Sequence, residues 1–226
     1  MSTLEQLNRL AANDVPAFVD VLHGIYEHSP WIPERAAKLA PFGNITALKQ
    51  AMQGVVFAAT RAEQLQLIRA HPELAGKAAI AGTLTAESTG EQAKAGLNLC
   101  SPEEFATLQQ LNSDYNSKFG FPFILAVKGA TGKGLTRQQI IATFTRRLRN
   151  QPEDELREAL RQIGRIAEMR INDLLGHVPA IGATVMEWAE DIAAWSEDEG
   201  ALTCTYMSDA HRRTANQIAD WMRAAG

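Results

Sequence analysis

The sequence predicts an all-α fold, a helical bundle followed by a short helical C-terminal appendage. Three observations lead to this expectation. Helix-start signals recur along the chain, apolar residues follow them at helical spacing, and the alternating pattern of strands does not recur. Helices joined by short loops, without alternation of strands and helices, pack into bundles.

The helix starts are marked by capping boxes, in which a Ser or Thr and a Glu or Gln three residues later satisfy unpaired backbone groups. They are Ser2 with Glu5, Thr60 with Glu63, Ser88 with Glu91, and Thr136 with Gln139. The clearest start is at Ser101, where a hydroxyl caps the helix, Pro102 takes the first helical position and Glu104 takes the third. Each of these signals predicts a helix that begins there.

Apolar stripes identify the faces that the helices should bury. They are Phe18, Val21, Leu22 and Ile25; Phe105, Leu108, Leu111 and Tyr115; and Leu156, Leu160, Ile163, Ile166 and Met169. The last of these helices can end at Gly176, because glycine commonly closes a helix. The helix that begins after Thr60 must end at or before His71, because Pro72 disfavours helical geometry in the residue that precedes it.

Composition favours a globular protein and excludes several kinds of partner. The 226 residues are 46% hydrophobic, carry a net charge of −4 and include two cysteines, Cys100 and Cys204. The acidic balance argues against a nucleic-acid partner, and no apolar run approaches the ~20 residues that span a membrane. Without a secretory leader, both cysteines are expected to be reduced thiols, which predicts a cytoplasmic protein.

The charge balance changes near residue 177. Residues 178–226 contain eight acidic residues and three arginines, a net charge of −5, whereas residues 1–177 contain 18 acidic and 19 basic residues, a net charge of +1. Three of the four tryptophans also lie in the later segment. We therefore expect a domain over residues 1–177 and an appendage over residues 178–226.

Neither a metal site nor a phosphate-binding loop is expected. The five histidines show no metal-ligand spacing on one helix, and the two cysteines stand apart, so no zinc site is predicted. The glycine-rich residues 129–134 lack the spacing of a phosphate-binding loop. A flexible loop before the Thr136 cap explains them better.

His71 is a candidate for proton transfer. Pro72 fixes it at a helix exit, where a desolvated, neutral imidazole suits proton transfer near pH 7. A histidine whose only role is to form hydrogen bonds within a turn would fit the same position.

Two segments and one arginine fit either a site or ordinary packing. Residues 88–92 place backbone N–H groups, Glu91 and Gln92 at a helix start, which can bind an anion or simply cap the helix. Residues 118–127 are very apolar and broken by glycine and proline, which suits a pocket wall with free backbone N–H groups or plain core packing. Arg165 needs an anionic partner if it faces the core and none if it is solvated.

Four stretches stand in one characteristic order and spacing. They are residues 27–31 (Glu-His-Ser-Pro-Trp), 71–77, 88–97 and 119–124 (Phe-Gly-Phe-Pro-Phe-Ile). Together they resemble the 2-oxo-4-hydroxy-4-carboxy-5-ureidoimidazoline (OHCU) decarboxylases of urate breakdown. The resemblance covers residues 1–177 and implies an all-α fold, no cofactor and a homodimer.

The resemblance also implies site residues. The family's proton-donating histidine falls on His71, and its active-site arginine falls on Arg165, with Arg170 as the alternative. Glu91 is implied as a third catalytic residue, either protonated or acting as a carboxylate that repels the carboxylate of the substrate. The implied substrate contacts are Pro72, Ser88, Thr89, Gly90, Glu91, Gln92, Phe123, Ile124, Leu125, Ala126 and Val127.

The implied activity is decarboxylation of OHCU to (S)-allantoin. Loss of carbon dioxide can push electrons into the C=N bond of the substrate ring, so the substrate carries its own electron sink. The reaction therefore needs no metal, pyridoxal or thiamine. A non-catalytic helical binding module and a hydrolase of 5-hydroxyisourate are the alternatives.

Residues 178–226 resemble a different family. The stretches at 201–206, 210–213 and 221–226 are similar to the opening of an allantoate amidohydrolase. Those metal-dependent hydrolases have much longer chains, so we expect a helical appendage without a second activity. Its apolar stripes predict that it packs on the bundle or on a second copy of the chain.

Overall fold

The computed structural model describes residues 3–74, 88, 100–127, 134–176, 189, 192–193, 195–198 and 203–225. Within these ranges all regular structure is helical, which confirms the predicted all-α fold. The helices with defined bounds are α1 (Leu4–Asn13), α2 (Val15–Val21), α3 (Trp31–Ala37), α4 (Ile45–Ala58), α5 (Arg61–Ala70), α8 (Pro102–Phe119), α9 (Arg137–Arg147), α10 (Pro152–Leu175) and α12 (Asp209–Ala225). The chain divides into two compact units: Met1–Gly129 with Lys133–Val178, and Ala130–Gly132 with Pro179–Gly226.

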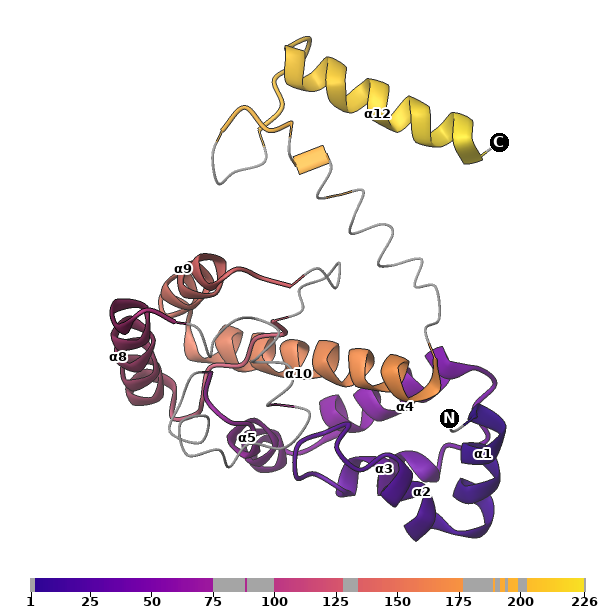
Figure 1. The fold of residues 1–226 in the computed structure, drawn as a ribbon. Coiled ribbons are helices and arrows are strands. Elements are labelled where there is room, and N and C mark those ends of the chain that lie inside the picture. Colours follow the sequence, from indigo (N-terminus) through magenta and orange to yellow (C-terminus); the bar gives the residue numbers. More distant parts are fainter. Residues whose placement is uncertain are drawn as a thin grey trace. The chain divides into compact units, whose positions relative to one another are not determined.

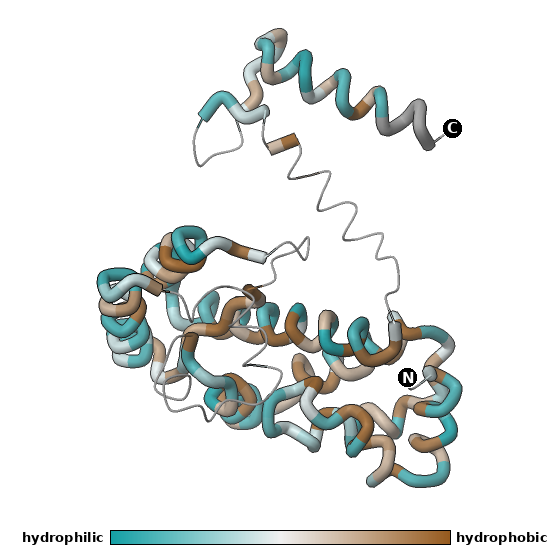
Figure 2. Tube along the Cα trace, viewed as in Figure 1, coloured by the Kyte–Doolittle hydropathy of each residue, from teal (hydrophilic) through white to brown (hydrophobic). Residues whose placement is uncertain are grey.

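The first unit is organised around α10. This helix of 24 residues contacts α4, α5 and α8 and runs through the middle of the unit (Figure 1). Its inward face is apolar, since Leu160, Ile163, Ala167 and Ile171 are each at most 3% exposed. Spacings of three and four residues place these side chains on one face of the helix. Figure 2 shows the apolar and polar bands that this periodicity produces along the helices of the unit.

Most of the predicted helix starts are confirmed. Thr60, Ser101 and Thr136 each form a complete capping box with the residue three positions later. The predicted start at Ser2 is wrong by one residue, because the hydroxyl of Thr3 accepts the hydrogen bond from the N–H of Gln6 at 3.2 Å. Neighbouring hydroxyl side chains offer alternative caps, and sequence alone does not choose between them.

The stripe from Phe18 to Ile25 is not one helix. Helix α2 ends at Val21, and Gly24 adopts a positive φ of 87° that turns the chain. Phe18, Leu22 and Ile25 are nevertheless buried, so a helix followed by turns fills the same part of the core. The turns also carry Glu27 into the interior.

Two helix ends shape the part of the unit that holds the candidate site. Helix α5 ends at Ala70, with His71 in extended geometry as predicted. Helix α8 ends at Gly120, whose φ of 74° suits glycine. The following residues 121–127 are buried but not helical. Gly176, with a φ of 90°, closes α10 as predicted.

The second unit contains α12 and a turn that precedes it. The backbone N–H of Thr205 donates to the Glu197 carboxylate at 2.7 Å. The guanidinium of Arg213 on α12 lies 5.2 Å from the centre of the Trp195 ring. No helix in the described part of the chain combines the length and hydropathy required to cross a membrane.

Candidate active site

A pocket in the first unit gathers several of the predicted residues. Its described lining comes from the end of α5, from Ser88, from the non-helical segment after α8, and from the inward face of α10. The lining residues are His71, Pro72, Leu74, Ser88, Phe123, Ile124, Leu125, Val127, Ile166 and Arg170. Segments that are far apart in the sequence therefore meet at one place.

His71 is held in a defined orientation within this pocket. The residue is 7% exposed, and its Nδ1 lies 2.9 Å from the backbone carbonyl oxygen of Leu67. Because a carbonyl oxygen can only accept, Nδ1 carries the hydrogen and Nε2 keeps its lone pair. The ring is thus set to accept a proton at Nε2.

Burial controls the protonation of His71. Desolvation lowers the pKa of His71 from 6.5 to about 4, partly opposed by the Leu67 carbonyl and the negative charge of Glu27. The positive charge of Arg170 also lowers this pKa. At neutral pH the imidazole is therefore uncharged.

The arginine that lies beside His71 is Arg170, not Arg165. Arg165 is exposed and lines a separate depression between α4 and α10. Ile163, Ile166 and Arg170 lie on the buried face of α10, because spacings of three and four residues return to the same side of a helix. Arg165 precedes Ile166 by one residue, which is a rotation of about 100° around the helix axis, and it therefore lies on a different face. The pocket that holds His71 thus contains the alternative arginine, Arg170, and the assignment of the active-site arginine stays a prediction.

Arg170 belongs to a buried network with Glu27 and Ser88. Its Nη1 donates to Glu27 Oε2 at 2.8 Å and to the Gly24 carbonyl oxygen at 2.7 Å. The Ser88 hydroxyl donates to the other carboxylate oxygen of Glu27 at 3.0 Å. This network links α10 to the loop between α2 and α3.

Ser88 is the predicted N-cap of a helix, and this cap stays a prediction because its partner Glu91 lies outside the described residues. Ser88 has helical backbone geometry, and its side chain serves as a donor to Glu27. The other predicted contacts from this segment, Thr89, Gly90, Glu91 and Gln92, lie outside the described residues.

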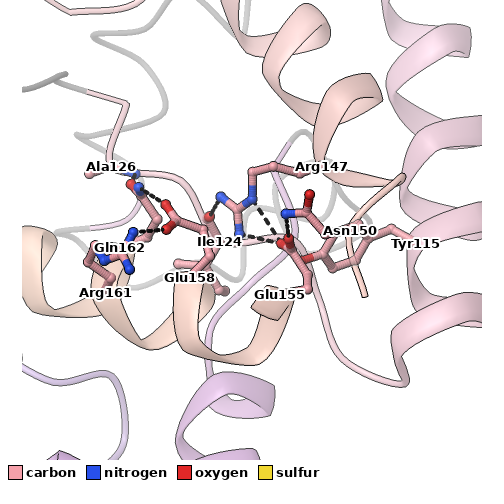
Figure 3. Close-up of polar contacts among 9 residues, drawn as sticks. All are labelled: Tyr115, Ile124, Ala126, Arg147, Asn150, Glu155, Glu158, Arg161 and Gln162. Atoms are coloured by element: carbon pink, nitrogen blue, oxygen red, sulfur yellow. Dashed lines mark hydrogen bonds and ion pairs between the residues drawn. The ribbon is translucent and has the colours of Figure 1, made fainter. Parts of the chain in front are cut away.

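The pocket wall after α8 is fixed from behind by α9 and α10. Arg147 Nη1 donates to the carbonyl oxygen of Ile124 at 2.7 Å, and its guanidinium lies 4.5 Å from the centre of the Phe123 ring. The N–H of Ala126 donates to Gln162 Oε1 at 3.0 Å. Figure 3 shows both helices contributing to these contacts.

Not every predicted contact residue of this wall lines the pocket. Phe123, Ile124, Leu125 and Val127 line the pocket, but Ala126 does not. The Ala126 N–H donates to Gln162 Oε1, and a substrate contact at Ala126 stays a prediction. In a non-helical buried segment, backbone groups must find such partners, and only some of them can remain directed at a pocket.

Sequence reasoning assigned no role to Glu27, Arg147, Glu155 or Gln162. Glu27 lies in one of the four matching stretches, and a carboxylate among apolar residues is a signal that could have drawn attention to it. The contacts of the other three depend on tertiary packing, for which the sequence gives no local sign. Among the described residues, no three His, Cys, Asp or Glu side chains cluster to hold a metal ion.

Comparisons with known proteins agree on one family. A family model described as OHCU decarboxylase matches residues 11–172. A protein from Haloferax volcanii named 2-oxo-4-hydroxy-4-carboxy-5-ureidoimidazoline decarboxylase is 41% identical over 169 residues, which cover 75% of this chain and 94% of the relative.

Two solved structures are similar to the chain. A crystal structure of (S)-allantoin synthase superposes with a TM-score of 0.60 at 28% identity, over 77% of this chain and 54% of that one. A crystal structure of OHCU decarboxylase in the presence of (S)-allantoin gives a TM-score of 0.53 at 21% identity, over 66% of this chain and 94% of the other. The second comparison supports the fold alone.

Proposed function

Because the chain belongs to the OHCU decarboxylase family, we propose that it is a carboxy-lyase that converts OHCU to (S)-allantoin in urate breakdown. The observation that carries the proposal is the buried, neutral His71 in the same pocket as Arg170. An oriented imidazole suits the proton transfers, and a guanidinium suits the polar oxygens of the substrate.

The substrate determines which steps the protein must support. The bond to the carboxylate breaks, and its electron pair moves into the ring C=N bond, whose nitrogen is then protonated. The hydroxyl next to the lost carboxylate must release its proton to become a carbonyl. The adjacent ring carbon, which bears the ureido group, must gain a proton on one face. Overall, the substrate anion takes up one proton and releases carbon dioxide.

His71 performs the proton relay in this scheme. Its Nε2 lone pair accepts the hydroxyl proton, and the resulting imidazolium returns a proton to one face of the ring carbon. Arg170 binds substrate oxygens and limits the ring to one orientation. Delivery to a single face gives one enantiomer.

Glu91 and Gln92 complete the proposed site through the family resemblance. They hold the hydroxyl and the ring nitrogens of the substrate. Glu91 acts either protonated or as a charged group that destabilises the substrate carboxylate. Glu91→Gln distinguishes these roles: retained activity supports the protonated form, and slower turnover with equal or tighter binding supports repulsion.

The test is an optical assay with freshly generated urate-oxidation products. The protein should produce dextrorotatory allantoin faster than the spontaneous racemic background, without accelerating loss of the preceding hydroxyisourate. His71→Ala should reduce turnover by about 100-fold or more, while exposed His23→Ala should not. Near-full turnover by a folded His71→Ala protein would refute the proposed relay.

We also propose that the protein is a cytoplasmic homodimer. The exposed Leu39 and Phe57, at 58% and 52%, supply apolar surface for self-association. Cys100 and Cys204 are free thiols, which suits a reducing compartment. Sedimentation at several concentrations and cell fractionation test the two parts.

A further inference from the structure

We propose that Glu27 is a positioning residue that holds Arg170 and Ser88 in place and offsets the arginine's positive charge toward the substrate. The inference rests on the proposed function, because the charge matters for a substrate that must lose its carboxylate. Glu27 does not line the pocket itself but lies behind Arg170. It therefore acts through its neighbours.

The position of Glu27 is built into the loop between α2 and α3. The Glu27 backbone carbonyl accepts a hydrogen bond from the Ser29 hydroxyl at 2.9 Å, and His28 adopts a positive φ of 46°. A positive φ is uncommon for residues other than glycine and indicates a tightly specified turn. The turn directs the Glu27 side chain inward, where the residue is 2% exposed.

Both carboxylate oxygens of Glu27 are used to orient pocket residues. One oxygen accepts from Ser88 at 3.0 Å, and the other accepts from Arg170 at 2.8 Å. The Arg170 Nη2 also lies 3.5 Å from the Ser88 hydroxyl oxygen. Removal of Glu27 would therefore take a hydrogen bond from two lining residues at once.

The pair also contributes to the charge of this part of the site. The side chains of Arg170 and Glu27 are 6% and 1% exposed, so each charge depends on the other for stabilisation. Their formal charges sum to zero. Arg170 thus offers oriented N–H donors to the substrate while its charge is largely compensated.

This compensation favours decarboxylation over tight binding. The substrate enters with its negative charge on the carboxylate, and this charge moves into the ring as carbon dioxide leaves. A full positive charge bound to the carboxylate would stabilise the starting state more than the transition state. Glu27 limits that stabilisation and keeps Arg170 directed at the polar oxygens.

Glu27→Gln tests the proposal, because it removes the charge and keeps one of the two oxygen acceptors. We measure kcat and KM, and calorimetric binding of neutral allantoin and of allantoate, its ring-opened carboxylate. We expect Glu27→Gln to bind allantoate about 10-fold more tightly, to bind allantoin unchanged, and to lose kcat while KM falls. Glu27→Asp keeps the charge and should not gain affinity for allantoate.

Two further variants separate charge from structure. Glu27→Gln combined with Arg170→Gln removes both charges and should lose the added affinity for allantoate. Glu63→Gln makes the same chemical change in the exposed Arg35–Glu63 pair and should change nothing. Circular dichroism checks that each protein is folded.

The outcomes decide the proposal independently of the overall reaction. Tighter allantoate binding in Glu27→Gln alone supports it. Equal or weaker allantoate binding in a folded Glu27→Gln protein overturns it, as does tighter binding in Glu27→Asp. These measurements need no turnover, so a wild-type protein that fails to decarboxylate OHCU would refute the proposed function separately.

Discussion

Two buried arginine–glutamate pairs in the described part of the first unit use α10 in different ways. Arg147 of α9 pairs with Glu155 near the start of α10, and their side chains are 2% and 0% exposed. Arg170, near the end of the same helix, pairs with Glu27 at similar burial. Burial and ion pairing alone would not show which pair belongs to a site.

The difference lies in what else each arginine contacts. Arg147 donates to Glu155 and to the Ile124 carbonyl, and Glu155 also accepts from the hydroxyl of Tyr115. Those contacts hold the pocket wall from behind. Arg170 itself lines the pocket, beside a histidine suited to proton transfer. The comparison teaches that a buried pair belongs to a site when it borders a cavity and a titratable group.

The largest expected effect is on the structural pair. Glu155→Gln leaves Arg147 buried without a countercharge and should lower the free energy of unfolding by about 3–5 kcal/mol. Urea denaturation measures this loss. Glu63→Gln, in an exposed pair, serves as the control and should have little effect. A Glu155→Gln protein with wild-type stability would show that the Arg147–Glu155 pair does not stabilise the fold.

The next largest effect is the pH dependence of stability, and it arises from His71 in the pocket. The pKa of His71 is about 4 in the folded protein, against 6.5 for an exposed histidine. Between these values the unfolded chain binds a proton that the folded protein does not, so stability is complete above pH 6.5 and falls as the pH decreases toward 4. The expected loss is about 3 kcal/mol.

Urea denaturation of wild type and His71→Asn across pH 7 to 4 measures this contribution. The asparagine does not titrate, so the stability of the variant should fall less steeply. Parallel curves for the two proteins would mean that His71 keeps an ordinary pKa in the folded state.

A smaller effect on stability and activity is expected at the pocket wall that follows α8. Gln162→Leu leaves the buried N–H of Ala126 without its acceptor and should cost about 1–3 kcal/mol of stability. The wall should also loosen, so that kcat/KM falls by about 10-fold. Gln138→Leu on the exposed part of α9 is a matched control. Unchanged activity and stability in Gln162→Leu would show that the wall does not depend on this contact.

The smallest effect is expected from removing the second unit. Every proposed site residue lies before residue 177, so a chain truncated after His177 should keep kcat/KM within about two-fold. Loss of solubility or a changed oligomeric state would fit a packing role for residues 178–226. Lost turnover in a folded truncated chain would place part of the site in those residues.

Local features were predictable from the sequence because their causes are local. The capping box at Ser101, the helix end before Pro72 and the interruption at Gly120 depend on neighbouring residues alone. The sequence could also place His71 at a helix exit, although it could not establish its burial or tautomer.

Other features depended on tertiary contacts. Glu27 and Arg170 are separated by 143 residues, and no local pattern announces their contact. The choice between Arg165 and Arg170 required the rotation of α10 relative to the pocket. Ala126 could not be recognised as engaged without knowing that Gln162 lies behind it.

The end of α5 has a consequence for how the protein can change over generations. In a continuing helix, the N–H of residue 71 would bond to the Leu67 carbonyl, but here it bonds to Ile68 at 3.1 Å instead. The Leu67 oxygen is thereby released for the imidazole. The group that selects the tautomer is thus a main-chain atom that every amino acid provides. No codon change at position 67 can delete it, so this part of the site is protected from drift as long as the helix ends where it does.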